Sequence, residues 1–139
     1  MTTSTGQPGE TPVRSGGLAS HHLSGFVATA DPVRAKAFYR DTLGLRLIQE
    51  DQFMMVFDAN GTKLRVVTFP SVTPAPLTVV HWEVPGIAAA VQDLARAGVT
   101  FERYEKMVQD ELGIWKSWSG SLVAWFKDPD GNILSLTQF

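Results

Sequence analysis

The chain contains no cysteine among its 139 residues. That absence excludes disulfide bonds, thiolate metal sites and a cysteine nucleophile. There is also no excess of charge of one sign, since 12 Lys and Arg residues stand against 14 Asp and Glu residues, for a formal net charge of −2. Binding to nucleic acid or to an anionic membrane surface depends on a basic patch. The composition therefore predicts neither kind of partner.

Long apolar runs are missing as well. A transmembrane helix needs about 20 apolar residues, and a secretory signal needs a basic start followed by an apolar block. The sequence has neither pattern, so we expect a cytoplasmic protein. Residues 1–20 combine Thr, Ser, Gly and Pro with almost no large apolar side chains. Such a segment cannot offset the entropy of ordering it, and we expect a flexible N-terminal tail.

What the sequence does contain is a repeat. Its first copy begins with strand-like LSGFVATA (Leu23–Ala30) and helix-like DPVRAKAFYRDTLG (Asp31–Gly44), followed by LRLIQ, FMMVF and KLRVVTF. Its second copy begins with TVVHWEV (Thr78–Val84) and GIAAAVQDLARAG (Gly86–Gly98), followed by VTFERY, SLVAWF and NILSLTQF. One strand, a helix and three strands leave a face of the sheet uncovered. Two such units together predict a pocket between them.

Turn and cap signals divide the chain into these two units. Asp31-Pro32 is typical of a helix start, and Asn60-Gly61 is the strongest hairpin signal because a two-residue turn needs positive φ at both centres. The proline-rich segment 70–76 cannot continue a sheet and is predicted to be a linker. We therefore expect one domain over residues 21–139, with module one at 22–69 and module two at 77–139.

Residues 105–120 break the pattern with acidic residues, glycine and two tryptophans. The segment is longer than a hairpin connection needs, and long loops over a pocket are often functional covers. An irregular strand followed by a surface turn is the alternative. The sequence does not decide between the two.

The layout resembles the vicinal oxygen chelate superfamily, which includes glyoxalase I, extradiol dioxygenases, fosfomycin-resistance enzymes and bleomycin-binding proteins. The resemblance rests on the paired units, on FYRDTLGL at the end of the first helix and on KDPDGNILSLTQ near the end of the chain. It implies an α+β fold in which two βαβββ modules form a curled mixed sheet around a central cleft. It also implies that a second chain often completes the cleft, so we expect a homodimer.

The resemblance further implies four inward positions that hold a metal ion in the metal-dependent members. Counting from the helix starts and from DPDG places them at Ser24, Arg65, Val79 and Ser135, with Val67 as a neighbouring alternative to Arg65. Valine cannot coordinate a metal, arginine repels a cation and a serine hydroxyl binds weakly. We therefore expect no metal and no other cofactor.

His81 is the one histidine inside a predicted strand. It is a candidate ligand-binding donor or general base, and a hydrogen-bonded histidine lining the cleft is the structural alternative. Glu83 shares its predicted face and would pair with His81 or Arg65 if buried. A metal site built from His22, His81 and Glu83 is a further alternative.

Arg65 and several aromatic residues complete the predicted ligand-binding set. An arginine in a cleft can clamp a carboxylate or phosphate, although a salt bridge to Glu83 or another acid would use the same group. Phe26 and Trp125 are assigned to the cleft face, and Trp115, Trp118 and Tyr104 are expected to close over it. A dimer interface or an ordinary core would use the same aromatic residues.

Three functions follow as hypotheses. The first is a metal-independent protein that binds a small organic ligand, similar to the bleomycin-binding proteins, although a net charge of −2 offers little attraction for a cationic drug. The second is a lyase, isomerase or dioxygenase that uses unusual metal ligands or His81 as an acid–base catalyst. The third is a dimerising interaction module. The scaffold alone does not decide among them.

Overall fold

The computed structural model describes residue 12 and residues 14–139. Most of the expected flexible tail, residues 1–20, lies outside the described residues. Module one contains β1 (Ser24–Thr29), α1 (Pro32–Lys36), η1 (Ala37–Thr42), β2 (Arg46–Glu50), β3 (Met54–Ala59) and β4 (Thr62–Thr68). Module two contains β5 (Thr78–Glu83), α2 (Ile87–Arg96), β6 (Trp115–Lys116), β7 (Leu122–Lys127) and β8 (Ile133–Gln138). Among the described residues, no helix has the length and hydropathy needed to cross a membrane.

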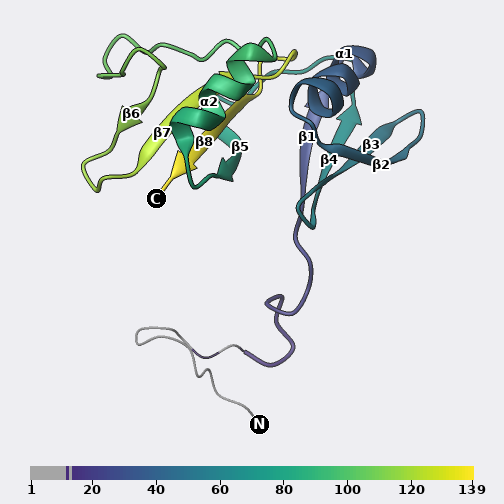
Figure 1. Ribbon diagram of the computed structural model, residues 1–139. Helices are drawn as coiled ribbons and strands as arrows, with labels where there is room; N and C mark the ends of the chain where they lie inside the picture. Colours follow the sequence, from purple (N-terminus) through teal and green to yellow (C-terminus); the bar gives the residue numbers. More distant parts are fainter. Residues whose placement is uncertain (1–11, 13) are drawn as a thin grey trace.

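Each module forms its own four-stranded mixed sheet (Figure 1), in the order β1-β4-β3-β2 and β5-β8-β7-β6. The first and last long strands of each module pair in parallel, β1 with β4 and β5 with β8, and the other neighbours are antiparallel. This confirms the α+β class and the two βαβββ modules. The strands β1 and β5 lie at the adjacent edges of the two sheets, toward the middle of the molecule.

Local signals account for most element boundaries. The Asp31 side chain accepts a hydrogen bond from the Arg34 amide at 3.2 Å and caps α1, as predicted. Asn60 and Gly61 both have positive φ, 51° and 95°, and join β3 to β4 in the predicted tight hairpin. The segment 70–76, between β4 and β5, contains no strand.

Two elements differ from the prediction. The first helix is α-helical only over Pro32–Lys36 and continues as a π-helix over Ala37–Thr42, where the amide of Leu43 donates to the carbonyl of Phe38. The segment VTFERY forms no strand of its own and contributes only the bridge between Phe101 and Phe126. The fourth strand of module two is instead the short β6.

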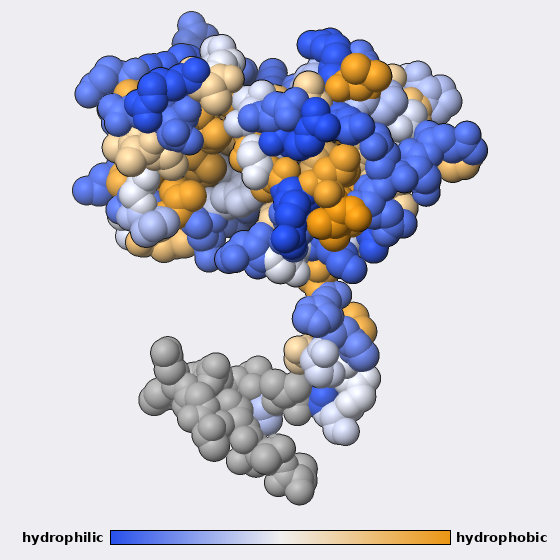
Figure 2. Space-filling model, turned by 45° about the vertical axis from the view of Figure 1, so that its right-hand side comes forward, coloured by the Kyte–Doolittle hydropathy of each residue, from blue (hydrophilic) through white to orange (hydrophobic). Residues whose placement is uncertain are grey.

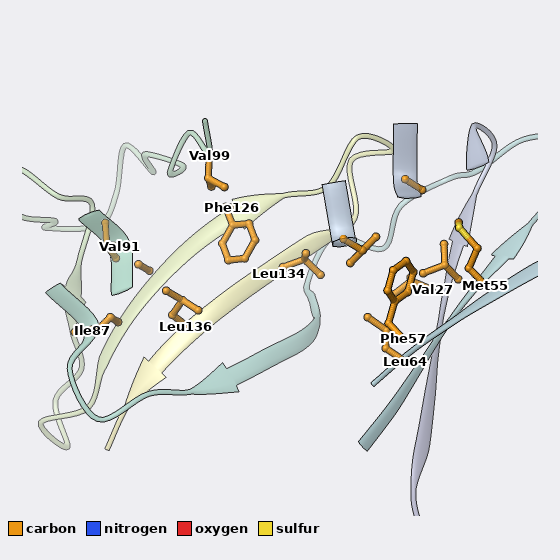
Figure 3. Packing of buried hydrophobic residues seen from close by; sticks show 14 of the residues in the cluster. Val27, Met55, Phe57, Leu64, Ile87, Val91, Val99, Phe126, Leu134 and Leu136 are labelled. Atoms are coloured by element: carbon orange, nitrogen blue, oxygen red, sulfur yellow. The ribbon is translucent and has the colours of Figure 1, made fainter. Parts of the chain in front are cut away.

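The hydrophobic core lies between the helices and one face of each sheet and runs through both modules (Figure 3). Phe57 of module one and Phe126 of module two are completely buried. The ring of Phe38, on η1, lies 6.4 Å from that of Phe126, so the first helix packs against the second module as well as its own. Five side chains of module two belong to this core or pack against it, namely Val80, Trp82, Phe126, Leu134 and Leu136.

The modules are joined at one end by the turn Asp128–Asn132, which we call the clasp. The Tyr39 hydroxyl donates to Asp128 Oδ2 at 2.6 Å, and Asn132 Nδ2 donates to the Ala28 carbonyl at 2.9 Å. Asn132 Nδ2 also donates to Asp128 Oδ2 at 2.8 Å. The turn that joins β7 to β8 therefore also holds β1 and η1 of the other module.

Tyr39 is the buried centre of the clasp, with none of its surface exposed. Its burial raises the pKa of its hydroxyl far above the ordinary value, and the neighbouring Asp128 carboxylate raises that pKa further. A third contact, from the Ala30 amide to Asp130 Oδ1 at 2.8 Å, lies beside it. The clasp is thus a hydrogen-bonded polar cluster placed next to the apolar core.

Candidate functional site

A groove lies between the two modules, at the end of β1 away from the clasp. Its larger part is a hollow of about 680 Å³ between the start of β1, the β3–β4 hairpin and the strand β5. Its smaller part, about 350 Å³, surrounds Ser24 and Arg65. Leu23 and Lys63 line both parts, so the two hollows adjoin. Each volume falls within the range of about 300–1,000 Å³ that small-molecule sites occupy.

Another cavity, of about 190 Å³, lies on the helix side of the sheets, between Leu43, Leu45 and α2. Its walls are almost entirely apolar and include Phe126 and Leu136 of the core. It is smaller than ordinary ligand sites. We interpret it as a packing gap where η1 meets the second module.

The groove brings together five of the nine residues predicted to bind a ligand. Val79, His81 and Glu83 line the larger part, and Ser24 and Arg65 line the smaller part. The other four residues lie outside it, on the sheet faces, namely Phe26, Trp115, Trp125 and Ser135. Residues from both modules therefore meet at the groove, although the predicted set does not converge on one point.

Arg65 is half-buried and is held by its neighbours on module one. Its Nε donates to Ser24 Oγ at 3.1 Å, and its Nη1 lies 4.0 Å from Met54 Sδ. The guanidinium carbon lies 6.0 Å from the centre of the Phe26 ring. Among the described residues it forms no salt bridge, so the anticipated pairing with Glu83 is wrong. Glu83 is exposed, and water removes the need for a partner.

The strand β5 contains an irregularity that sequence alternation did not reveal. Thr78 pairs with Ile133 and Val80 pairs with Leu134, so Val79 is an extra residue with no partner on β8. His81, two residues later, pairs with the buried Ser135. The His81 side chain is exposed and forms no hydrogen bond within the part of the chain that the structure describes.

The aromatic residues of module two form a separate cluster. The ring of Trp125 lies 5.5 Å from that of Tyr104 and 5.9 Å from that of Trp115. Trp118 was expected to close over the cleft, but its side chain is 98% exposed, at a turn between β6 and β7. Figure 2 shows that exposed apolar side chains gather in patches on the face in view.

Residues 105–120 form an irregular strand and a surface turn, the second of the two predicted alternatives. Gln109 pairs with Trp115, and its side-chain amide donates to the carbonyls of Glu102 and Gly113. The Asp110 carboxylate accepts the amides of Leu112 and Ile114. None of these residues lines the groove.

Among the groove residues that were not in the predicted ligand-binding set are Leu23 and Lys63. Lys63 is exposed to solvent near the hairpin turn and also lines both parts of the groove. Its position two residues before Arg65 on β4 puts it on the same face of the strand. That spacing was the available signal.

Comparison with known protein families shows to which superfamily the chain belongs. The model of the Glyoxalase/Bleomycin resistance protein/Dioxygenase superfamily matches residues 19–136. The chain belongs to that superfamily. No curated protein matches it in sequence.

Solved structures of the superfamily share the fold at low sequence identity. A member from Sphaerobacter thermophilus is 20% identical, with a TM-score of 0.68 over 88% of this chain and 99% of that one. A lactoylglutathione lyase from Agrobacterium tumefaciens is 16% identical, with a TM-score of 0.63 over 86% and 93%. A glyoxalase family protein from Enterococcus faecalis is 18% identical, with a TM-score of 0.61 over 84% and 94%. These likenesses establish the fold alone.

The residues at the superfamily's four metal positions do not fit a metal ion. Ser24 Oγ already accepts a hydrogen bond from Arg65 Nε and donates one to the Lys63 carbonyl at 3.2 Å. Arg65 brings a permanent positive charge, and Val79 has no donor atom. Across the described residues, no three or more His, Asp or Glu side chains gather where they could hold a metal.

Proposed function

We propose that this superfamily member binds a small organic ligand, without a metal ion, in the groove between its two modules. The observation that carries the proposal is that predicted site residues from both modules line two adjoining hollows of ligand size. The groove also combines apolar walls, such as Leu23 and Val79, with a few polar groups. Ligand sites typically have that composition.

A matched pair of valine variants tests the groove. In Val79→Trp a large ring would fill the larger hollow, whereas Val108→Trp adds the same ring at a side chain that is 90% exposed, away from the groove. Amide NMR spectra of the wild-type protein, recorded with a library of small organic compounds, are expected to identify ligands that shift groove residues. Val79→Trp should lose those shifts and Val108→Trp should keep them. Ligands that bind both variants equally would contradict the proposal.

We also propose that the protein forms a homodimer. The strands β1 and β5 each pair on one side only, and the apolar side chain of Phe26 on β1 is 64% exposed. Exposed apolar strand edges are usually covered. Light scattering of the wild-type protein should give twice the mass of the chain. In Phe26→Asp the measured mass should fall toward that of a single chain. Phe53→Asp, at an equally exposed phenylalanine on the β2–β3 turn, should not.

The enzymatic alternative rests on His81 alone. It stays a prediction, because the described residues place no hydrogen-bonding partner beside this side chain that would orient it as a base. An activity that is lost in His81→Ala while the thermal midpoint stays unchanged would favour it.

A further inference from the structure

The charges of the groove are unevenly distributed. The smaller part is lined by two cationic side chains, Lys63 and Arg65, and by no carboxylate. Glu83 is the one acidic residue among the described residues that line the larger part. This concentration of positive charge lies in a chain whose net charge is −2. A local excess of one sign against the overall charge indicates a site for a ligand of the opposite sign.

Neither cation has an acidic partner among the residues that the structure describes. The salt bridges among the described residues use Lys36, Arg40, Arg46, Arg96 and Lys127 instead. A half-buried guanidinium is ordinarily paired with a carboxylate or phosphate, because it presents a planar fork of N–H donors. Arg65 therefore has the surroundings of an arginine whose partner comes from outside the chain.

The fork of Arg65 is also oriented in advance. Of its five N–H donors, Nε is engaged by Ser24, and one on Nη1 points toward the Met54 sulfur. The donors of Nη2 and the second one of Nη1 have no partner among the described residues. Because Ser24 and the Phe26 ring hold the side chain, little rotamer entropy remains to be lost when an anion binds.

We propose that the outer edge of the Arg65 guanidinium, assisted by Lys63, binds a carboxylate or phosphate group on the ligand, with Ser24 as a positioning residue. The cation that the superfamily often supplies as a metal ion is here part of the chain. This inference rests on the proposed function, since it names the class of ligand for the same groove.

Three probes that share one ring separate charge from shape: benzoate, phenyl phosphate and the neutral benzamide. Amide NMR titration of the full chain should show both anions shifting Ser24, Lys63 and Arg65, with affinities that fall as ionic strength rises. Benzamide should bind more weakly and without salt dependence. The anion that binds more tightly then shows whether the ligand's charged group is a carboxylate or a phosphate.

Arg65→Gln should lower the affinity for the two anions about ten- to hundredfold, as expected when a charge-assisted hydrogen bond is lost. Benzamide, which carries no charge, should lose less affinity than the anions, and unchanged amide signals outside the groove should show that the variant is folded. The matched control is Arg46→Gln, at an arginine of the same sheet that is 76% exposed and paired with Asp58. This control should change nothing.

The outcomes separate this inference from the proposed function. If the groove binds all three probes alike, or if Arg65→Gln keeps the preference for anions, the anion site is wrong while ligand binding stands. If none of the probes shifts a groove residue, both are overturned. In Ser24→Ala the Arg65 guanidinium keeps its charge but loses the hydrogen bond that orients it. The affinity for anions should therefore fall, but less than in Arg65→Gln.

Discussion

The two ends of the interface between the modules are built differently. At the clasp, hydrogen bonds from Tyr39, Asn132 and Ala30 cross between the modules. At the groove, the edges of β1 and β5 leave a hollow instead of pairing. The two ends therefore differ in what they contribute: the clasp holds the modules together, and the groove leaves a hollow of the size of a small-molecule site. Variants at the clasp should therefore change stability, and variants at the groove should change binding.

The largest effect is expected from Asp128→Ala. The Asp128 carboxylate accepts hydrogen bonds from Tyr39, from the amides of Asp130 and Asn132 and from the Asn132 side chain. Removing it leaves several buried donors unpaired, which should cost about 3–5 kcal/mol of unfolding free energy. Urea denaturation measures this value. Asp93→Ala, at an exposed carboxylate on α2, is the control and should cost less than about 0.5 kcal/mol. If both variants lost the same unfolding free energy, the clasp would have no special role in stability.

Tyr39→Phe should have the next largest effect, a loss of about 1.5–3 kcal/mol at neutral pH. It should also change the alkaline limb of the stability curve. The pKa of Tyr39 is raised in the folded state, so the unfolded chain loses its tyrosine proton first and stability falls as pH rises above about 10.

In Tyr39→Phe this alkaline component should be absent, and the difference from wild type should shrink as pH rises. The only other tyrosine in the chain is Tyr104. Burial and Glu102 raise its pKa too, but it lies outside the clasp. Tyr104→Phe should keep most of the alkaline loss. If that variant abolishes it instead, the clasp is not its source.

The smallest effect belongs to the groove. Glu83→Gln removes the carboxylate from the larger hollow, so benzoate affinity should rise about two- to threefold, as expected for a partly screened charge. The unfolding free energy should stay within about 0.5 kcal/mol of wild type. Glu111→Gln, on an exposed turn outside the groove, should leave the affinity unchanged. A fall in benzoate affinity in Glu83→Gln would mean that this side chain contacts the ligand.

Features determined by neighbouring residues could be predicted from the sequence. The Asn60-Gly61 hairpin, the Asp31 cap and the alternation that buries Leu134 and Leu136 all follow from local geometry. The repeat and the DPDGN motif then predicted the pairing of modules and the superfamily. The hairpin, the cap and the alternation depend on residues a few positions apart, and the repeat is a pattern along the chain. Both kinds of signal can therefore be recognised without a structure.

Features that depend on distant partners could not be predicted. The contact between Tyr39 and Asp128 joins residues 89 positions apart, and nothing near either residue indicates it. The extra residue at Val79 appears only in the pairing of β5 with β8. The environment of Arg65 depends on Ser24 of β1 and Met54 of β3, so its contacts could not be predicted, and the structure shows no pairing with Glu83.

The clasp and the groove lie at opposite ends of β1. The clasp grips β1 at Ala28–Ala30, whereas the groove lies beside the start of that six-residue strand, about 20 Å away at the rise of an extended chain. A rotation of only about 5° at the clasp would therefore move the groove wall by about 2 Å. A change in the few hydrogen bonds of the clasp would therefore alter the width of the groove at the other end of β1.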